Sequence, residues 1–246
     1  TLDTAYDYGN THKILGEIGL KNWKINTKLP KINLNSNNIE TEILQYVEKI
    51  LNDLNIQKIE SLLVHFPDQL LEAKGEVIYN TLTKLKRTEI VSEIGFSANS
   101  VEQIKLLLDK YETDIVQFSL NILDRRIIKS GLLDKLYNLN IKLQIRSIFL
   151  QGLLLMTKKE MPNYFRRWDS LWNIWINFHL QNNYNYIETC ISFVMKYRKK
   201  ISKYLIGINN SKELEEIIMS NINPGNIPNN FFSNEEDLIN PSIWKL

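Results

Sequence analysis

The sequence lacks several features that would narrow its function at once. Its single cysteine, Cys190, cannot form an internal disulfide, so a reducing compartment is the default expectation. A net charge of +2 on 246 residues argues against nucleic acid as a partner. The apolar runs 148–150 and 153–156 are far shorter than the roughly 20 residues of a membrane helix, and no signal-peptide pattern precedes Thr1. We therefore expect a cytoplasmic protein with no nucleic-acid or membrane partner.

Short apolar, β-branched runs alternate with longer amphipathic stretches along the chain. The runs are TLDTAY, KINTKL, SLLVHF, EIVSEIGFS, DIVQFSL, IKLQIRS and KYLIGI. Seven repeats of strand then helix predict an α/β fold with a parallel sheet and helices outside it. An open doubly wound sheet and a closed (β/α)8 barrel are the alternatives. No GxGxxG follows the first run and no P-loop is present, so we favour the barrel, although seven units are one short of a closed ring.

The amphipathic stretches show helical spacing most clearly in three segments, 38–54, 100–112 and 211–221. We expect Ser100 to cap the second of these helices and Ser211 to cap the third. No linker or low-complexity run divides the chain, so we expect a single domain over residues 1–246. Residues 222–246 lack a helical period and are expected to form an irregular tail.

Several other residues have a structural interpretation. Helical spacing predicts core positions for Trp168, Trp172, Trp175 and Phe178, and Cys190 is expected to be a small core residue. Surface or capping positions are expected for His12 and His179. Packing and lining a substrate pocket are equally open for Phe231, Phe232 and Trp244.

Polar side chains stand where the expected strands end, which is where (β/α)8 barrels place their chemistry. Asp3 and Tyr8 follow the first strand, Lys28 the second and His65 the third. A lysine or histidine at the end of an apolar strand is costly to bury unless it is paired. Each of these residues alone would most often be structural. Four of them on adjacent strands favour one shared site.

The motifs around these residues resemble those of aldo-keto reductases. DTAYDYGNTHKILGE, residues 3–17, resembles the family signature, in which an Asp and a Tyr five residues apart follow the second strand. TKLP and LLVHFPD resemble the strands that bear the family's lysine and histidine. IGFSANS, VQFSLNILDRR, RSIFLQGLL and LIGINNSKELEEI continue in family order to about Ile217. The resemblance implies a TIM barrel of which this sequence holds strands two to eight, the first strand and helix being absent from it.

The family's chemistry is hydride transfer between a nicotinamide cofactor, NAD or NADP, and a carbonyl. No side chain can donate a hydride, so carbonyl reduction needs a cofactor. The four polar side chains fit the remaining roles. Tyr8 would donate the proton as general acid, and Lys28 would favour its phenolate. Asp3 would hold Lys28, and His65 would donate a hydrogen bond to the carbonyl oxygen. No cluster of metal ligands is seen, and none is expected.

The resemblance also assigns the cofactor contacts, to Ser97, Gln117, Arg146, Ser147, Phe149, Gly152, Gly207, Asn209, Glu213 and Glu216. The family often has Ser-Asn at the first of these positions, whereas this chain has Ser97-Ala98. Arg146 stands where many members place a stacking tyrosine, and a planar guanidinium can also stack on a ring.

The identity of the cofactor and of the substrate is less constrained. Members that prefer NADP often place a basic residue at the position of Glu213, so an acid there weakens the expectation of NADP, although Lys212 next to it can offset the effect. The expected partner is a small carbonyl compound. RSIFLQGLLLM resembles bacterial members linked to surface-sugar synthesis, which suggests a keto-sugar or a nucleotide sugar as substrate. The alternative function is a reductase-like sensor or regulatory subunit that binds nicotinamide with little turnover.

Overall fold

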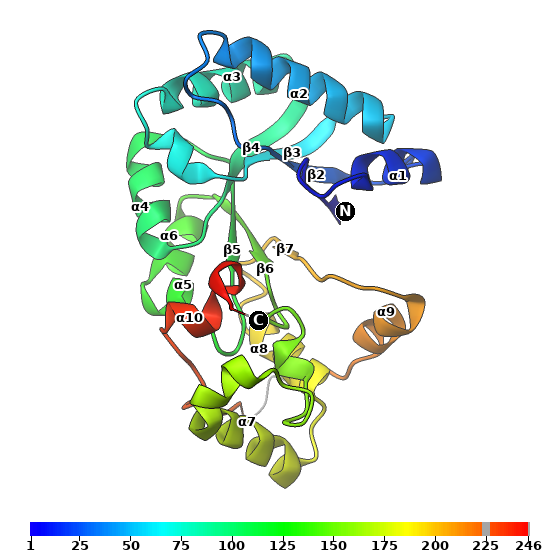
Figure 1. The fold of residues 1–246 in the computed structure, drawn as a ribbon, viewed down its shortest axis with the longest axis vertical. Coiled ribbons are helices and arrows are strands. Elements are labelled where there is room, and N and C mark those ends of the chain that lie inside the picture. The colour runs from blue at the N-terminus through cyan, green and yellow to red at the C-terminus, as the bar shows by residue number, and fades with distance from the viewer. Residues whose placement is uncertain (223–226, 246) are drawn as a thin grey trace. The chain divides into compact units, whose positions relative to one another are not determined.

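The computed structural model describes residues 1–222 and 227–245 (Figure 1). Its strands are β1 (Leu2–Asp3), β2 (Ile25–Leu29), β3 (Ile59–Val64), β4 (Val91–Ser97), β5 (Ile115–Ser119), β6 (Lys142–Arg146) and β7 (Lys203–Tyr204). Its α-helices are α1 (Thr11–Ile18), α2 (Ile39–Leu54), α3 (Gly75–Arg87), α4 (Val101–Lys110), α5 (Arg126–Lys129), α6 (Leu132–Asn138), α7 (Asp169–Asn182), α8 (Tyr186–Met195), α9 (Ser211–Ile218) and α10 (Glu236–Ile239). Short 3-10 helices are η1 (Pro67–Leu70), η2 (Leu153–Leu155), η3 (Asn163–Trp168) and η4 (Pro241–Ile243).

The strands confirm the predicted α/β architecture. Their order in the sheet is β1-β2-β3-β4-β5-β6-β7, and each of the runs predicted from the sequence contributes one strand. Every strand pair from β1 to β5 is parallel, as is the pair β6 and β7. Within the described residues the fold thus matches a (β/α)8 barrel that lacks one strand.

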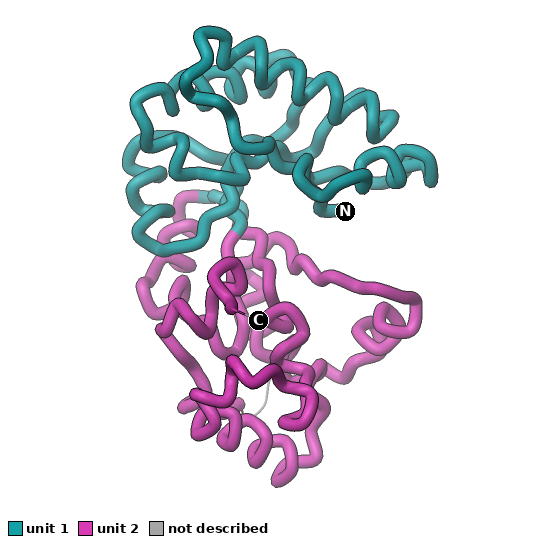
Figure 2. The backbone as a smooth tube through the Cα atoms, in the orientation of Figure 1, with its two compact units in different colours: residues 1–117, 140–142 teal, residues 118–139, 143–246 magenta. Residues whose placement is uncertain are grey.

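The chain forms two compact units, shown in different colours in Figure 2. Unit 1 holds residues 1–117 and 140–142, and unit 2 holds residues 118–139 with the described residues from 143 onward. A single domain over residues 1–246 stays a prediction. No helix in either unit, as far as the structure describes them, is long and apolar enough to cross a membrane.

The strand register of unit 1 gathers polar side chains on one face of its sheet. Asp3 of β1 lies beside Asn26 of β2, and Ser97 of β4 lies beside Gln117 of β5. Side chains alternate along a strand, so Lys28 projects from the same face of β2 as Asn26. The register therefore brings the carboxylate of Asp3 and the ammonium of Lys28 to one face.

The helices of unit 1 bury an apolar stripe against the sheet. Along α2, Ile43, Val47, Ile50 and Leu54 are buried at the helical spacing that the sequence shows. The cap predicted for α4 is confirmed, because the side chain of Ser100 accepts a hydrogen bond from the backbone N–H of Gln103.

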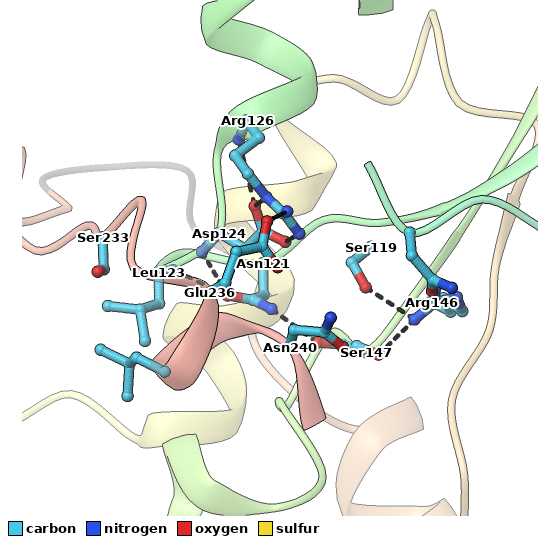
Figure 3. Close-up of polar contacts among 12 residues, drawn as sticks. Ser119, Asn121, Leu123, Asp124, Arg126, Arg146, Ser147, Ser233, Glu236 and Asn240 are labelled. Atoms are coloured by element: carbon cyan, nitrogen blue, oxygen red, sulfur yellow. Dashed lines mark hydrogen bonds and ion pairs between the residues drawn. The ribbon is translucent and has the colours of Figure 1, made fainter. Parts of the chain in front are cut away.

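Unit 2 has an aromatic core that the C-terminal segment completes. Trp172 and Trp175 of α7 are buried as predicted, and the ring of Trp175 stacks on Phe231 with centroids 4.6 Å apart. Ser233 donates its backbone N–H to the Leu123 carbonyl at 3.0 Å. Arg126 forms ion pairs with Asp124 and Glu236 (Figure 3). These contacts fix the C-terminal segment on the loop that follows β5.

The structure corrects three expectations from the sequence. The tail is not wholly irregular, because residues 236–239 form α10 and 241–243 form η4; residues 223–226 and 246 lie outside the described part. The cap of α9 is Asn210 rather than Ser211, because the Asn210 side-chain oxygen accepts the Glu213 N–H at 3.0 Å. The two histidines expected at the surface are buried, and each contacts a threonine hydroxyl; they are His12 and His179.

Candidate active site

The centre of the candidate site in unit 1 is a buried ion pair between β1 and β2. The Lys28 Nζ donates to the Asp3 Oδ2 at 2.6 Å and to the Thr4 carbonyl at 2.9 Å. The Lys28 side chain is 2% exposed and the Asp3 side chain 17%. A buried ammonium needs a paired carboxylate, so the pair that the sequence predicts is present.

Tyr8 lies in the turn that follows β1. The Lys28 Nζ is 5.6 Å from the centroid of its ring, and the ring is about half exposed. The turn is held by the backbone N–H of Tyr8, which donates to the Ala5 carbonyl at 3.1 Å. A phenol that is open to solvent on one side and near a buried ammonium on the other is suited to proton donation.

His65 follows β3 directly and completes the group of four. Its ring centroid is 6.2 Å from that of Tyr8, with the planes at 81°. Its Nδ1 is 3.3 Å from the Asp7 Oδ2, a contact that the sequence analysis missed. The sequence could have pointed to Asp7, which lies inside the signature stretch. It could not show the contact itself, because Asp7 lies 58 positions before His65.

Ser97 and Gln117 extend the polar group on the same face of unit 1. The Ser97 hydroxyl donates to the Gln117 Oε1 at 3.1 Å, and the Gln117 Nε2 donates to the Asp3 Oδ1 at 3.0 Å. Ser97 and Gln117 are both buried. The structure therefore brings together six of the predicted site residues in unit 1.

In unit 2, Arg146 ends β6 beside two serines (Figure 3). Its Nη1 donates to the Ser119 Oγ at 2.9 Å and lies 3.5 Å from the Ser147 Oγ. The Ser147 carbonyl accepts a hydrogen bond from the Asn121 side chain at 3.0 Å. The sequence pointed to Arg146 and Ser147, whereas Ser119 and Asn121 were missed because their roles appear only through these contacts.

The loop after β6 has an unusual backbone. Ser147, Leu150, Gln151 and Gly152 all have positive φ, at 60°, 47°, 54° and 83°. A left-handed conformation costs a non-glycine residue free energy, and such positions gather at ligand-binding sites. Phe149 is half-buried within this loop. The loop is the same stretch that the resemblance assigns to the cofactor's pyrophosphate.

The N-terminus of α9 already holds a carboxylate. The Glu213 Oε2 accepts the Asn209 backbone N–H at 2.8 Å, and Oε1 accepts the Asn210 side-chain N–H at 3.0 Å. These bonds, led by the one from Asn209, hold the pKa of the Glu213 carboxyl below its usual value. Glu216 and Gly207 are both exposed.

The residues present fit a nicotinamide cofactor. Ser97 and Gln117 supply the hydroxyl and amide that a carboxamide can bond with, as donor and as acceptor. In unit 2, taken by itself, a Cβ at Gly207 would meet no atom within 4 Å, so the backbone at this residue is sterically accessible.

Comparison with known proteins gives a consistent result. The model of the aldo/keto reductase family matches residues 1–225. Among solved structures, an aldo-keto reductase of Bacillus halodurans in its holo form is similar with a TM-score of 0.72 and 15% identity, over 89% of this chain and 76% of that one. A putative aldo-keto reductase of Pseudomonas aeruginosa gives 0.61 and 18%, over 88% and 74%. A glycerol dehydrogenase of Gluconobacter oxydans gives 0.62 and 18%, over 90% and 82%. No curated protein matches the chain.

Proposed function

Because the chain belongs to the aldo/keto reductase family, we propose that it reduces an aldehyde or ketone to an alcohol with NAD(P)H, with Tyr8 as the general acid. The observation that carries the proposal is the buried Lys28 ammonium, which contacts Asp3 and lies 5.6 Å from the Tyr8 ring. Membership of the family supports this class of chemistry. The four side chains supply what a carbonyl reduction needs besides a hydride.

When bound, NAD(P)H supplies the hydride. Tyr8 donates its phenolic proton to the carbonyl oxygen as negative charge develops there. The Lys28 ammonium stabilises the phenolate that remains, and Asp3 positions Lys28 through the bond of 2.6 Å. Ser97 and Gln117 would hold the carboxamide, and Arg146, Ser147, Phe149, Gly152, Gly207, Asn209, Glu213 and Glu216 stay the proposed contacts for the rest of the cofactor.

The Asp7 contact sets a condition on the role of His65. With Nδ1 donating to Asp7, a neutral ring carries no hydrogen on Nε2. Donation from Nε2 to the carbonyl oxygen therefore requires the protonated ring, which a neighbouring carboxylate favours. As the pH is raised, the activity of an Asp7→Asn variant should therefore begin to fall at a lower pH than that of the parent. An unchanged pH profile would show that this contact plays no part.

The direct test is oxidation of NADPH and NADH with a panel of aldehydes, ketones and keto-sugars. Tyr8→Phe should lower kcat by about 10²–10⁴-fold, because the ring stays and only the acid is lost. Tyr6→Phe is the matched control, since Tyr6 packs edge-on against Tyr46 and lies outside the proposed site. If the parent and Tyr8→Phe are equally slow while both bind cofactor, the chain is a nicotinamide sensor and the proposal fails.

We further propose that the cofactor is NADH rather than NADPH. The Glu213 carboxylate occupies the N-terminus of α9, so a 2′-phosphate there would meet a like charge. Glu213→Gln should improve the affinity for NADPH relative to NADH by up to about tenfold. Glu215→Gln, an exposed carboxylate on the same helix, is the control. Tighter binding of NADPH than NADH by the parent, measured by fluorescence titration, would refute the preference.

A further inference from the structure

Gln117 connects two groups that have separate roles in the proposed reaction. Its Oε1 accepts from the Ser97 hydroxyl at 3.1 Å and its Nε2 donates to the Asp3 Oδ1 at 3.0 Å. The other oxygen of Asp3 accepts from Lys28 at 2.6 Å. A continuous chain of hydrogen bonds therefore runs from Ser97 through Gln117 and Asp3 to the ammonium beside Tyr8.

The hydrogen bond between Gln117 and Asp3 joins residues that are far apart in the sequence and in the strand order. Gln117 lies 114 positions after Asp3, on β5, whereas Asp3 ends β1, at the end of the strand order. The sheet of unit 1 must curve strongly for these side chains to meet. β1 has only two residues and pairs only with β2 in the described part of the chain, so its backbone alone holds the carboxylate of Asp3 weakly.

We propose that Gln117 is a positioning residue of the reaction, which fixes the Asp3 carboxylate so that only one of its oxygens faces Lys28. The inference deepens the proposed function and rests on it for its role in carbonyl reduction. Asp3 is held between two donors from two different strands, β2 and β5. Lys28 is thereby neutralised only in part and keeps a positive field at the Tyr8 ring.

The direction of the effect follows from the charges. Without the Gln117 donor, the carboxylate can turn both oxygens toward Lys28, and the partial positive charge of the amide hydrogen is lost as well. Both changes reduce the positive potential at the Tyr8 hydroxyl and make it a weaker acid. Through Asp3, Gln117 thus also connects the proposed carboxamide site, which includes Ser97, with the proton donor Tyr8.

The test is a titration of the Tyr8 phenol in cofactor-free protein. Phenolate absorbance is followed against pH for the parent and Gln117→Met, each corrected with its Tyr8→Phe version. The midpoint should rise by on the order of half a pH unit in Gln117→Met, a fraction of what a directly facing charge produces. In an Asp3→Asn background the same substitution should produce a much smaller shift, since most of its effect passes through Asp3.

Gln69→Met is the matched control. Gln69 is also buried in unit 1, and its amide bonds only the backbone of Ile32 in the described residues. It should lose stability without moving the Tyr8 midpoint. No shift in Gln117→Met, or an equal shift in both backgrounds, overturns the inference.

Two further measurements separate the possible failures. Should Gln117→Met not fold, Ser97→Ala is the second variant, because it removes the hydrogen bond from Ser97 to the Gln117 Oε1. It should raise the Tyr8 midpoint by a smaller amount, and no rise overturns the inference. If the shift is present but no carbonyl compound is reduced, the proposed function fails while the assigned coupling stands. If reduction occurs, the pH profile of kcat should show a step that depends on Tyr8, separate from the one that depends on Asp7 and His65, and this step should move upward in Gln117→Met; an unmoved step would refute a role in catalysis.

Discussion

Replacing Lys28 by methionine should separate the structural from the chemical role of the buried pair. The Lys28 side chain is 2% exposed and its Nζ makes bonds of 2.6 Å to Asp3 and 2.9 Å to the Thr4 carbonyl. Removing one member of a buried pair costs about 3–5 kcal/mol, mostly because the other charge stays buried. Asp3 keeps the Gln117 bond and is 17% exposed. We therefore expect the lower end, about 3 kcal/mol of local stability.

The double variant with Asp3→Asn and Lys28→Met removes both charges. It should recover most of this loss, because no unpaired charge remains buried. It should not recover activity, since Tyr8 lacks the cation in both cases, and kcat should stay lower by about 10²–10⁴-fold. The second substitution is thus expected to restore stability but not turnover.

Hydrogen exchange at the amides of β2 and β3 is the suitable assay, because four of the five tryptophans lie in unit 2 and fluorescence would report mainly on that unit. Lys49→Met is the control, because Lys49 pairs with Asp53 at a similar distance, 2.7 Å, but is 48% exposed. Its loss should be under about 1 kcal/mol. Equal losses in Lys28→Met and Lys49→Met would refute the reasoning.

Three further predictions concern stability and reactivity. Asn26 is fully buried, and neither atom of its side-chain amide has a hydrogen-bond partner in the described residues. Asn26→Leu should therefore stabilise unit 1 by up to about 3 kcal/mol, as measured by hydrogen exchange. A loss of stability would show that the amide is hydrogen-bonded. Burial lowers the pKa of His179, so the unfolded chain binds this proton more readily and stability is lost as the pH falls below about 6.5. His179→Phe should make that decline shallower when unit 2 is unfolded in urea; an equally steep decline would contradict it. Burial also raises the pKa of the Cys190 thiol, so iodoacetamide should label it only after unfolding, as intact mass would show.

The periodicity of the sequence predicted the elements better than their ends. The apolar run TLDTAY gives a strand of only two residues, Leu2–Asp3, and KYLIGI gives Lys203–Tyr204. Both stand at the ends of the strand order, where a strand pairs on one side. Apolar composition indicates that a segment is buried, whereas the length of a strand depends on a neighbour that composition does not reveal.

The candidate site was predictable where its chemistry depends on residue type and register. Asp3 and Lys28 meet because parallel strands align their carboxyl ends, and both are recognisable as strand-end residues. The bonds from Asp7 to His65 and from Gln117 to Asp3 span 58 and 114 positions and depend on turn geometry and sheet curvature. The burial of His12 was missed for a similar reason, since its threonine partner lies on a different element.

The stacking of Phe231 on Trp175 has a consequence for biosynthesis. The two residues are 56 positions apart, and Leu238 and Ile239, which are fully buried, follow later still. During translation most of unit 1 is made first, as one continuous stretch up to residue 117. The indole rings of α7, by contrast, emerge from the ribosome long before the residues that cover them. In the nascent chain Trp172 and Trp175 therefore lack their contacts with Phe231 until almost the whole of this sequence has been synthesised.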